Sequence, residues 1–265
     1  VSDGVNTFSD NGDGTLTGAP SGTGTINYAT GAITITGGAA AAALTLDFNY
    51  YPNLPVMGLR KRELNEINAE ETIAFDTTYA YTFAGQWIEF IAGTTWTGDD
   101  TNFFWTTNYW IGDGNRKIFW ATNFSGTGGD PIRYTNGIAW VDFAPIINSA
   151  NDRLTQCLCM LPFRGRMVVF NTFEGQNLAA SVQFRQRIRW AAIGNPFSEV
   201  SVPAGVVTTV NADAWLDDIR GSGGFLDIPT AENIVSVGFV RDNLVVYCES
   251  STWQLRYTGR SIQPF

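Results

Sequence analysis

Histidine is absent from this chain of 265 residues. It is the side chain most used for proton transfer near neutral pH and the commonest metal ligand in proteins. Ser-His catalysis, Cys-His catalysis and histidine-ligated zinc are therefore excluded within the chain. Charged residues make up only 15% of the sequence, whereas aromatic residues reach 14%. This balance is typical of an all-β protein that has large surfaces to cover.

Cysteine is scarce, and its number is odd: Cys157, Cys159 and Cys248. A Cys-x-Cys pair with one distant third cysteine lacks the spacing of a zinc module, and it does not make a disulfide framework. We therefore expect three buried thiols that act as small hydrophobic side chains. The sequence predicts no metal site and no cofactor.

Long apolar runs are also missing, and no signal-peptide pattern opens the chain, so the sequence predicts no membrane anchor. The formal net charge is −9. A charge of this sign argues against general wrapping of nucleic acid and against binding to an anionic membrane surface.

The strongest pattern that is present is a short strand-like phrase with an aromatic residue at its fourth position. It occurs four times: Thr72-Ile73-Ala74-Phe75-Asp76, Lys117-Ile118-Phe119-Trp120-Ala121, Met167-Val168-Val169-Phe170-Asn171 and Leu244-Val245-Val246-Tyr247-Cys248. After the last three comes a second phrase with a nearby glycine: Ile132-Arg133-Tyr134 with Gly137, Ile188-Arg189-Trp190 with Gly194, and Leu255-Arg256-Tyr257 with Gly259. The first two intervals fit the roughly 40 to 50 residues of a four-stranded propeller blade.

We therefore predict an all-β fold with two domains. Residues 1–52 form a small Gly/Thr-rich β-hairpin module, with a hairpin over 24–36 and a further strand over 44–50. Residues 53–265 form an incomplete β-propeller-like array of antiparallel sheets, which we expect to be truncated at its C-terminus. Residues 59–71 fit either a helix or an outer strand followed by a turn, and 195–229 is the expected insertion behind the long third interval.

The candidate binding residues are Arg185, Arg187 and Arg189. On a strand they form one row, because successive side chains alternate between faces. Such a row could grip phosphates or carboxylates of a partner at a subunit interface. The alternative is that the arginines pair with acidic residues of adjacent strands. Because Arg133 and Arg256 occupy matching repeat positions, we expect a structural role for Arg189.

Three other motifs suggest chemistry only weakly. Residues 9–15 resemble part of a calcium loop but lack its end carboxylate, so a plain turn is favoured. Asp99 and Asp100 beside the aromatics of 96–105 suggest a glycosidase, but adjacent residues of an extended segment point apart. The glycines of 125–129 are not followed by a Lys-Ser/Thr pair, which argues against a phosphate loop. No catalytic residue is assigned, and we predict that the chain is not an enzyme.

Several phrases also resemble a known class of proteins. The hairpin phrase Gly24-Thr25-Ile26-Asn27-Tyr28 with Thr30-Gly31-Ala32-Ile33-Thr34-Ile35 is similar to one in tailed-bacteriophage structural proteins. The run 188–196, with Asn243-Leu244-Val245-Val246-Tyr247, Ser251-Thr252-Trp253-Gln254-Leu255 and Tyr257-Thr258-Gly259, resembles the propeller region of phage tail nozzle or tail-hub proteins. The resemblance implies a virion component near the portal end of a short tail.

The function expected from these observations is structural. The chain would form part of a ring-shaped tail or head-tail connector conduit, in contact with identical subunits and with other tail or portal-adaptor proteins. DNA would pass through the lumen without specific binding, because a negative lining repels it. The alternative is a carbohydrate-binding or carbohydrate-cleaving propeller that acts on host surface glycans. A third hypothesis is a module that contacts another virion protein through its N-terminal hairpins.

Overall fold

The computed structural model describes residues 1–27, 31–38, 45, 55–63, 70–110, 117–197, 211–260 and 263–265. The chain divides into two compact units, Val1–Tyr51 and Pro52–Phe265. Both are built from antiparallel sheets, of which the described residues form five, and none of these five closes into a barrel. No helix in the described part of the chain is long and apolar enough to cross a membrane.

The first unit is one four-stranded meander. Its strands are β1 (Thr7–Asp10), β2 (Thr15–Ala19), β3 (Thr23–Ile26) and β4 (Ile33–Thr36), in that order across the sheet. The predicted hairpin is confirmed, since β3 pairs antiparallel with β4. Phe8 and Leu16 are the buried apolar side chains of this small sheet. The strand predicted over 44–50 lies outside the described residues except for Thr45, which forms a bridge to Ser2.

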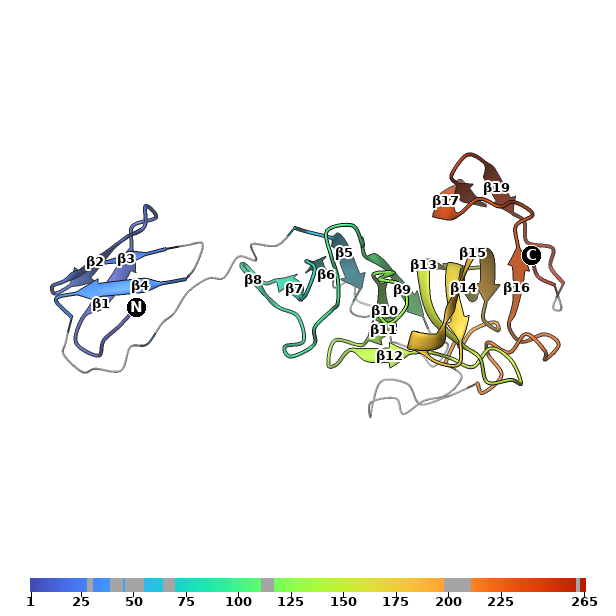
Figure 1. Cartoon of the computed structure of the whole chain (residues 1–265), viewed down its shortest axis with the longest axis horizontal. Helices are drawn as coiled ribbons and strands as arrows, with labels where there is room; N and C mark the ends of the chain where they lie inside the picture. Colours follow the sequence, from blue (N-terminus) through green and yellow to red (C-terminus); the bar gives the residue numbers. More distant parts are fainter. Residues whose placement is uncertain are drawn as a thin grey trace. The chain divides into compact units, whose positions relative to one another are not determined.

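The second unit contains four successive sheets (Figure 1). The first has β5 (Gly58–Glu63), β6 (Glu70–Phe75), β7 (Ala80–Phe83) and β8 (Trp87–Glu89), and the second has β9 (Trp105–Trp110), β10 (Lys117–Thr122), β11 (Ile132–Thr135) and β12 (Val141–Phe143). The third has β13 (Arg153–Phe163), β14 (Arg166–Gly175), β15 (Val182–Trp190) and β16 (Gly224–Asp227), and the fourth has β17 (Ile234–Val240), β18 (Asn243–Cys248) and β19 (Thr252–Leu255). A short 3-10 helix, η1 (Leu178–Ala180), connects β14 to β15.

Each repeated phrase occupies the same place in its sheet. The four aromatic phrases fall on β6, β10, β14 and β18, which are the second strands. Phe75, Phe170 and Trp120 are buried there, whereas Tyr247 of the fourth sheet is 38% exposed. The first strands contact one another in sequence, β5 with β9, β9 with β13 and β13 with β17. The predicted array of antiparallel, propeller-like sheets is therefore present.

The cores lie between neighbouring sheets. One buried cluster joins the second and third sheets around Trp120, Phe197 and Trp215. Another joins the third and fourth sheets around Phe170 and Leu244. Because each sheet buries one face against the next, the sheets depend on their neighbours for stability, as repeat units do.

Two details of the second unit decide open questions from the sequence. Residues 59–71 do not form a helix in their described part, because β5 runs over Gly58–Glu63 and β6 begins at Glu70. The segment 195–229 is not wholly an insertion outside the sheets, since Gly224–Asp227 is the outer strand of the third sheet. Residues 198–210 of that segment lie outside the described residues.

The register also changes the equivalence of the arginines. Arg133 on β11 lies across from Asp142 of the outer strand β12. In the third sheet, Arg187 lies across from Asp227 of β16, whereas Arg189 lies across from Phe225. Ile188 lies across from Phe170 as Tyr134 lies across from Trp120, so Arg187 and Arg133, the residues just before them, take the same register position. Arg187, not Arg189, is the structural counterpart of Arg133.

Candidate functional site

The predicted arginine row lies on β15, and its members differ in exposure: Arg185 is exposed, Arg187 is partly buried and Arg189 is buried. Arg187 and Arg189 both reach Glu174 on the neighbouring β14. Arg187 Nη1 donates to Glu174 Oε2 at 2.9 Å, and Arg189 Nε and Nη2 donate to Oε1 and Oε2 at 3.0 and 2.9 Å. Arg185 is exposed and forms no ion pair with the residues described in the structure. The structure therefore brings two of the three arginines together.

Two further carboxylates complete what we call the arginine cluster: Glu174, Arg187, Arg189, Asp217 and Asp227. Arg187 Nε and Nη2 donate to the two oxygens of Asp227 on β16, each at 2.8 Å. Arg189 Nη1 donates to Asp217 Oδ2 at 3.0 Å. The cluster thus ties β14, β15, β16 and the loop before β16 to one another. The sequence left two roles open for the arginines: binding a partner, or pairing with acids of adjacent strands. Arg187 and Arg189 pair with acids of adjacent strands.

Burial makes this cluster sensitive to the loss of any charge. The side chains of Arg189 and Glu174 are 1% and 5% exposed. Burial disfavours the charged form of Arg187, but the hydrogen bonds that it donates to Asp227 and the attraction of Glu174 and Asp227 outweigh this effect, so its pKa lies above the ordinary value. A buried charge without its partner is costly, because its hydration is lost without replacement.

Aromatic rings cover both faces of the Arg187 guanidinium. Its central carbon lies 3.9 Å from the ring centroid of Phe184 and 4.0 Å from that of Phe225. Rings attract a cation over their faces through the quadrupole of the π-system. With its edges bonded to carboxylates and its faces covered, Arg187 acts as a clamp between strands.

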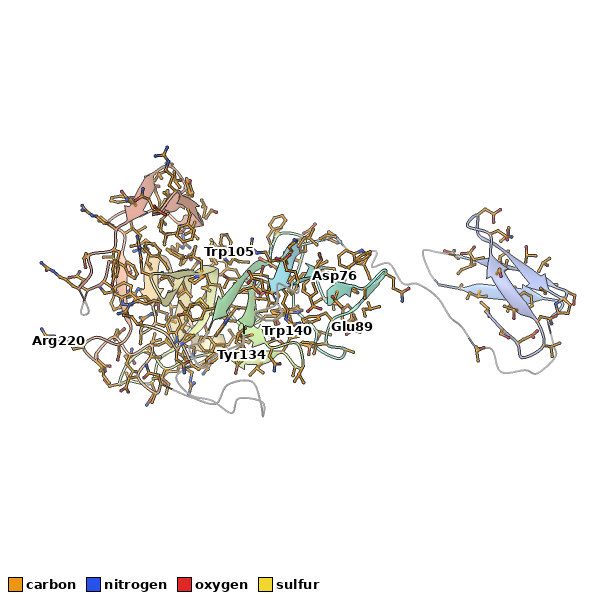
Figure 2. All side chains as sticks on the ribbon, turned by 180° about the vertical axis from the view of Figure 1, so that it is seen from behind. Asp76, Glu89, Trp105, Tyr134, Trp140 and Arg220 are labelled. Atoms are coloured by element: carbon orange, nitrogen blue, oxygen red, sulfur yellow. The ribbon has the colours of Figure 1, made fainter. Side chains whose placement is uncertain are left out.

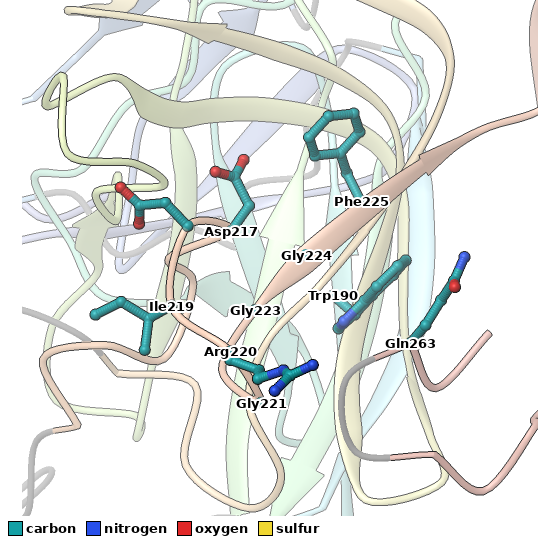
Figure 3. Close-up of a pocket in the computed structure, with 10 residues that line it drawn as sticks. Trp190, Asp217, Ile219, Arg220, Gly221, Gly223, Gly224, Phe225 and Gln263 are labelled. Carbon is teal, nitrogen blue, oxygen red and sulfur yellow. The ribbon is translucent and has the colours of Figure 1, made fainter.

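Two hollows adjoin the cluster and share Asp217 and Phe225. The first has a volume of about 580 Å³. It is lined by the cluster residues Glu174, Arg187 and Arg189 and by Ala180 of η1. The second, of about 410 Å³, is lined by Trp190, Gly223, Gly224 and Gln263 (Figure 3). Glycine is required at its floor, because a Cβ on Gly224 would lie 2.7 Å from the Trp190 ring and one on Gly223 would lie 2.5 Å from the Trp215 backbone.

The carboxylates of both hollows are already bound. Glu174 accepts from both arginines and from Thr172 Oγ1 at 2.7 Å, and Asp217 accepts from Arg189. Asp218 accepts the backbone N–H of Ser149 at 2.8 Å, and hydrogen bonding to Ser149 lowers its pKa. The arrangement offers no pair of free carboxylates for acid and nucleophile roles, so its chemistry is that of a structural ion network.

The aromatic cluster of 96–105 does not form a stacking platform. Trp96 is 3% exposed. Its ring packs edge-on against Phe75 and Trp140, and the Arg133 guanidinium lies 4.4 Å from its centroid. Asp99 is exposed and accepts the N–H groups of Thr101 and Asn102, as in a simple turn. Trp96 and Phe104 belong to the core between the first two sheets of the second unit, whereas Phe103 is 67% exposed and Trp105 packs against the other two cores.

The remaining sequence motifs do not form metal sites. In residues 9–15, Asp10 accepts the N–H of Gly12, and Asp13 accepts the N–H and hydroxyl of Thr15, which are the bonds of a tight turn. No group of three or more Cys, Asp or Glu side chains among the described residues could hold a metal ion.

The three cysteines are free and buried, as predicted. Burial raises the pKa of Cys159 to about 12 and that of Cys157 well above its ordinary value. Such thiols remain protonated at neutral pH, so they are poor nucleophiles and poor metal ligands.

Sequence reasoning missed the acidic half of the cluster. Glu174 lies on β14 after the third aromatic phrase, Asp217 lies in the loop before β16, and Asp227 lies in a segment interpreted as an insertion. One signal was present, because Phe225-Leu226-Asp227 resembles Val141-Asp142-Phe143 in being a short apolar run with one acid. A search for a fourth strand in every repeat would have found Asp227.

The fold and the site together define an all-β protein with a propeller-like array and an ion network in its third sheet. A comparison with protein-family models finds no match, and a comparison with curated proteins finds no match either. The functional argument therefore depends on the geometry of the chain itself.

Proposed function

We propose that the chain is a structural component of a bacteriophage virion, one subunit of a ring-shaped tail or portal-proximal conduit through which DNA passes. The observation that carries the proposal is the open array: the outer strands β8, β12 and β16 each have a single strand neighbour among the described residues. An unpaired strand edge presents backbone N–H and C=O groups that pair with another chain. Subunit contact is the function that such an array supports best.

The alternative function, a propeller that binds or cleaves host surface glycans, has less support from the arginine cluster and from Trp96. A sugar-cleaving site needs convergent free carboxylates in a pocket, and a sugar-binding site needs exposed aromatic faces. The carboxylates of the arginine cluster are engaged by arginines. The Trp96 ring is buried.

The charge of the chain supports a conduit rather than a DNA binder. At a net charge of −9 the chain repels polyanions in general. Proteins that hold DNA use clustered Lys and Arg on phosphates. The paired arginines Arg187 and Arg189 are neutralised within the chain by Glu174, Asp217 and Asp227. DNA would slide past such a subunit without being held.

Electron microscopy of the purified full chain, and of virions labelled with an antibody against it, tests the proposal. We expect closed rings with an axial lumen, and label at the tail or head-tail connector. A band-shift assay at about 0.1 M salt should show no retained DNA, because few phosphate contacts are available. A basic lumen, a chain that never assembles, or turnover of a glycan substrate would contradict the proposal.

A further inference from the structure

A groove crosses the first strands of all four sheets of the second unit. It has a volume of about 500 Å³, and residues of β5, β9, β13 and β17 line it together with Phe104, which precedes β9. Its floor contains the buried side chains of Met160, Leu161 and Val237. A hollow of this size receives a few side chains of a ligand rather than a whole protein surface.

Trp105 of β9 is fixed within this groove. Its Nε1–H donates to the main-chain oxygen of Met160 on β13. Its ring, labelled in Figure 2, packs against the core of the second and third sheets and against that of the third and fourth. Because the N–H group is used inside the chain, the ring offers the groove an apolar surface and not a hydrogen-bond donor.

Two large apolar side chains of the groove remain in contact with water. Leu59 on β5 is 63% exposed, and Phe239 on β17 is 51% exposed. The Phe239 ring centroid lies 5.8 Å from that of Phe163, so this ring rests on a buried neighbour. Exposed apolar side chains that gather along a hollow, unlike those scattered singly, mark a binding surface.

Each of these apolar residues has an arginine near it. Arg60 follows Leu59, is exposed and also lines the groove. Arg164 is exposed too, and its central carbon lies 5.7 Å from the ring centroid of Phe163, the neighbour of Phe239. Neither arginine forms an ion pair with an acid in the described part of the chain.

Two acids lie near the groove without pairing to these arginines. Glu63 lines it at the end of β5, where it is partly buried and Asn108 Oδ1 accepts its main-chain N–H at 3.2 Å. Asp242 lies next to Arg241 in the turn after β17. The groove therefore combines exposed apolar side chains with two arginines that lack carboxylate partners, in a chain of net charge −9. Such a local positive site selects an anionic partner.

We propose that this groove docks an extended peptide segment of a partner protein, in which bulky apolar side chains are flanked by carboxylates. The apolar side chains would enter the hollow beside Trp105, Leu59 and Phe239 and displace water from them. The carboxylates would reach Arg60 and Arg164, whose guanidinium groups offer paired donors to such groups. This inference does not rest on the virion proposal, because the chemistry of the groove alone defines the segment.

Fluorescence anisotropy of the full chain with three dye-labelled peptides tests the proposal. The probe is Asp-Glu-Leu-Phe-Glu-Asp. In the second peptide lysine replaces every acid, and in the third serine replaces the two apolar residues. We expect the probe to bind at least about tenfold more tightly than either of the others, because each lacks one of the two complementary features. No measurable binding of the probe, or equal binding of all three peptides, overturns the proposal.

Substitutions at exposed positions of the groove locate the binding. Leu59→Ser should weaken binding of the probe about tenfold, because it removes apolar contact. Arg60→Glu and Arg164→Glu should each weaken it at least about tenfold, because each opposes a carboxylate with another. The double reversal Arg60→Glu/Arg164→Glu should bind the lysine peptide more tightly than the unchanged chain does. Unchanged melting temperatures show that the variants remain folded.

Matched controls separate the groove from the rest of the surface. Ile138→Ser removes an apolar side chain that is 71% exposed in the second sheet's outer turn. Arg220→Glu reverses an exposed charge that lies well away from Trp105 in Figure 2. Both should leave binding of the probe unchanged. Equal losses in the groove variants and in these controls would contradict a defined site.

Two other occupants of the groove would overturn the proposal. Self-association in sedimentation velocity that the probe peptide abolishes would assign the groove to a second copy of the chain. A labelled DNA oligonucleotide whose binding depends on Arg60 and Arg164 would assign it to nucleic acid, and it would also contradict a conduit that does not hold DNA. Failure of the peptide alone leaves the conduit proposal standing.

Discussion

The third and fourth sheets of the second unit are built on the same plan but are completed differently. In the third sheet, β16 closes the outer edge, and the cluster of Glu174, Arg187, Arg189, Asp217 and Asp227 binds it to the two strands before it. In the fourth sheet, the described strands are β17, β18 and β19, and Arg256, which directly follows β19, pairs with no acid among the described residues. The difference shows which features hold a sheet together.

The same repeated aromatic shows this contrast within the cores. Phe170 is 0% exposed between the third and fourth sheets, whereas Tyr247 in the matching position is 38% exposed. The phrase therefore marks the second strand in both sheets, and Leu244 and Val246 of the fourth phrase are buried, but the aromatic residue itself is a core side chain in the third sheet and not in the fourth.

The largest expected effect is the difference between Phe170→Ala and Tyr247→Ala in the free energy of unfolding. Phe170→Ala removes a fully buried ring and leaves a cavity, so we expect a loss of about 3–5 kcal/mol in the free energy of unfolding. Tyr247→Ala removes a ring already in contact with water and should cost about 1 kcal/mol or less. Urea unfolding monitored by tryptophan fluorescence measures both. Equal losses would show that the fourth sheet is packed as tightly as the third.

Glu174→Gln removes the carboxylate that Arg187 and Arg189 share in the third sheet. The amide cannot balance the buried Arg189, so we expect a loss of about 3 kcal/mol, in the range for breaking one partner of a buried pair. The control is Glu70→Gln, which removes the exposed partner of Lys61 in the first sheet and should change stability by about 0.5 kcal/mol or less. The two free energies come from the same denaturant titrations. A small effect of Glu174→Gln would mean that Arg189 reaches water when unpaired.

The sequence predicted the fold class well because two kinds of signal were local. The aromatic phrases are short apolar runs, and each falls on the second strand of its sheet. The hairpin over 24–36 has a glycine turn, and it forms β3 and β4. Strand type depends mainly on such local patterns of residues.

The site could be predicted only in part, because its geometry depends on register. Alternation along β15 correctly placed Arg187 and Arg189 near each other, but it did not show that Glu174 lies between them. Ile188 lies across from Phe170 and Tyr134 lies across from Trp120, so Arg187, and not Arg189, matches Arg133. The similar phrases Ile132-Arg133-Tyr134 and Ile188-Arg189-Trp190 do not reveal this register, so sequence equivalence and structural equivalence diverge at that point.

Asp227→Asn tests how firmly the outer strand is held. The Asp227 side chain is 38% exposed, so solvent screens its pair with Arg187, and we expect a loss of about 0.5–1 kcal/mol. Its counterpart Asp142 is 68% exposed, and Asp142→Asn should cost less than about 0.5 kcal/mol. Amide exchange of 224–227 should also accelerate in Asp227→Asn. Unchanged exchange there would show that backbone pairing alone retains β16.

The smallest effect is expected at the turn that holds β19 in the fourth sheet, where a carboxylate takes the place of an arginine clamp. Glu232 accepts the N–H groups of Ser250 and Ser251 and the Ser251 hydroxyl at 2.9–3.0 Å. The N–H of Ser250 and the side chain of Ser251 lower its pKa below the ordinary 4.5.

A lowered pKa stabilises the fold above the pKa of the unfolded chain, and this stabilisation is lost as pH falls through the folded value. Glu232→Gln should therefore lower the melting temperature slightly at neutral pH, and its difference from the unchanged chain should shrink on acidification from about pH 7 to about pH 3. Melting curves across this range measure the effect, with Glu249→Gln on the same surface as the control. A difference that is constant with pH would show that the Glu232 carboxylate holds the turn no better than an amide, and that the fourth sheet is held by strand pairing and packing instead.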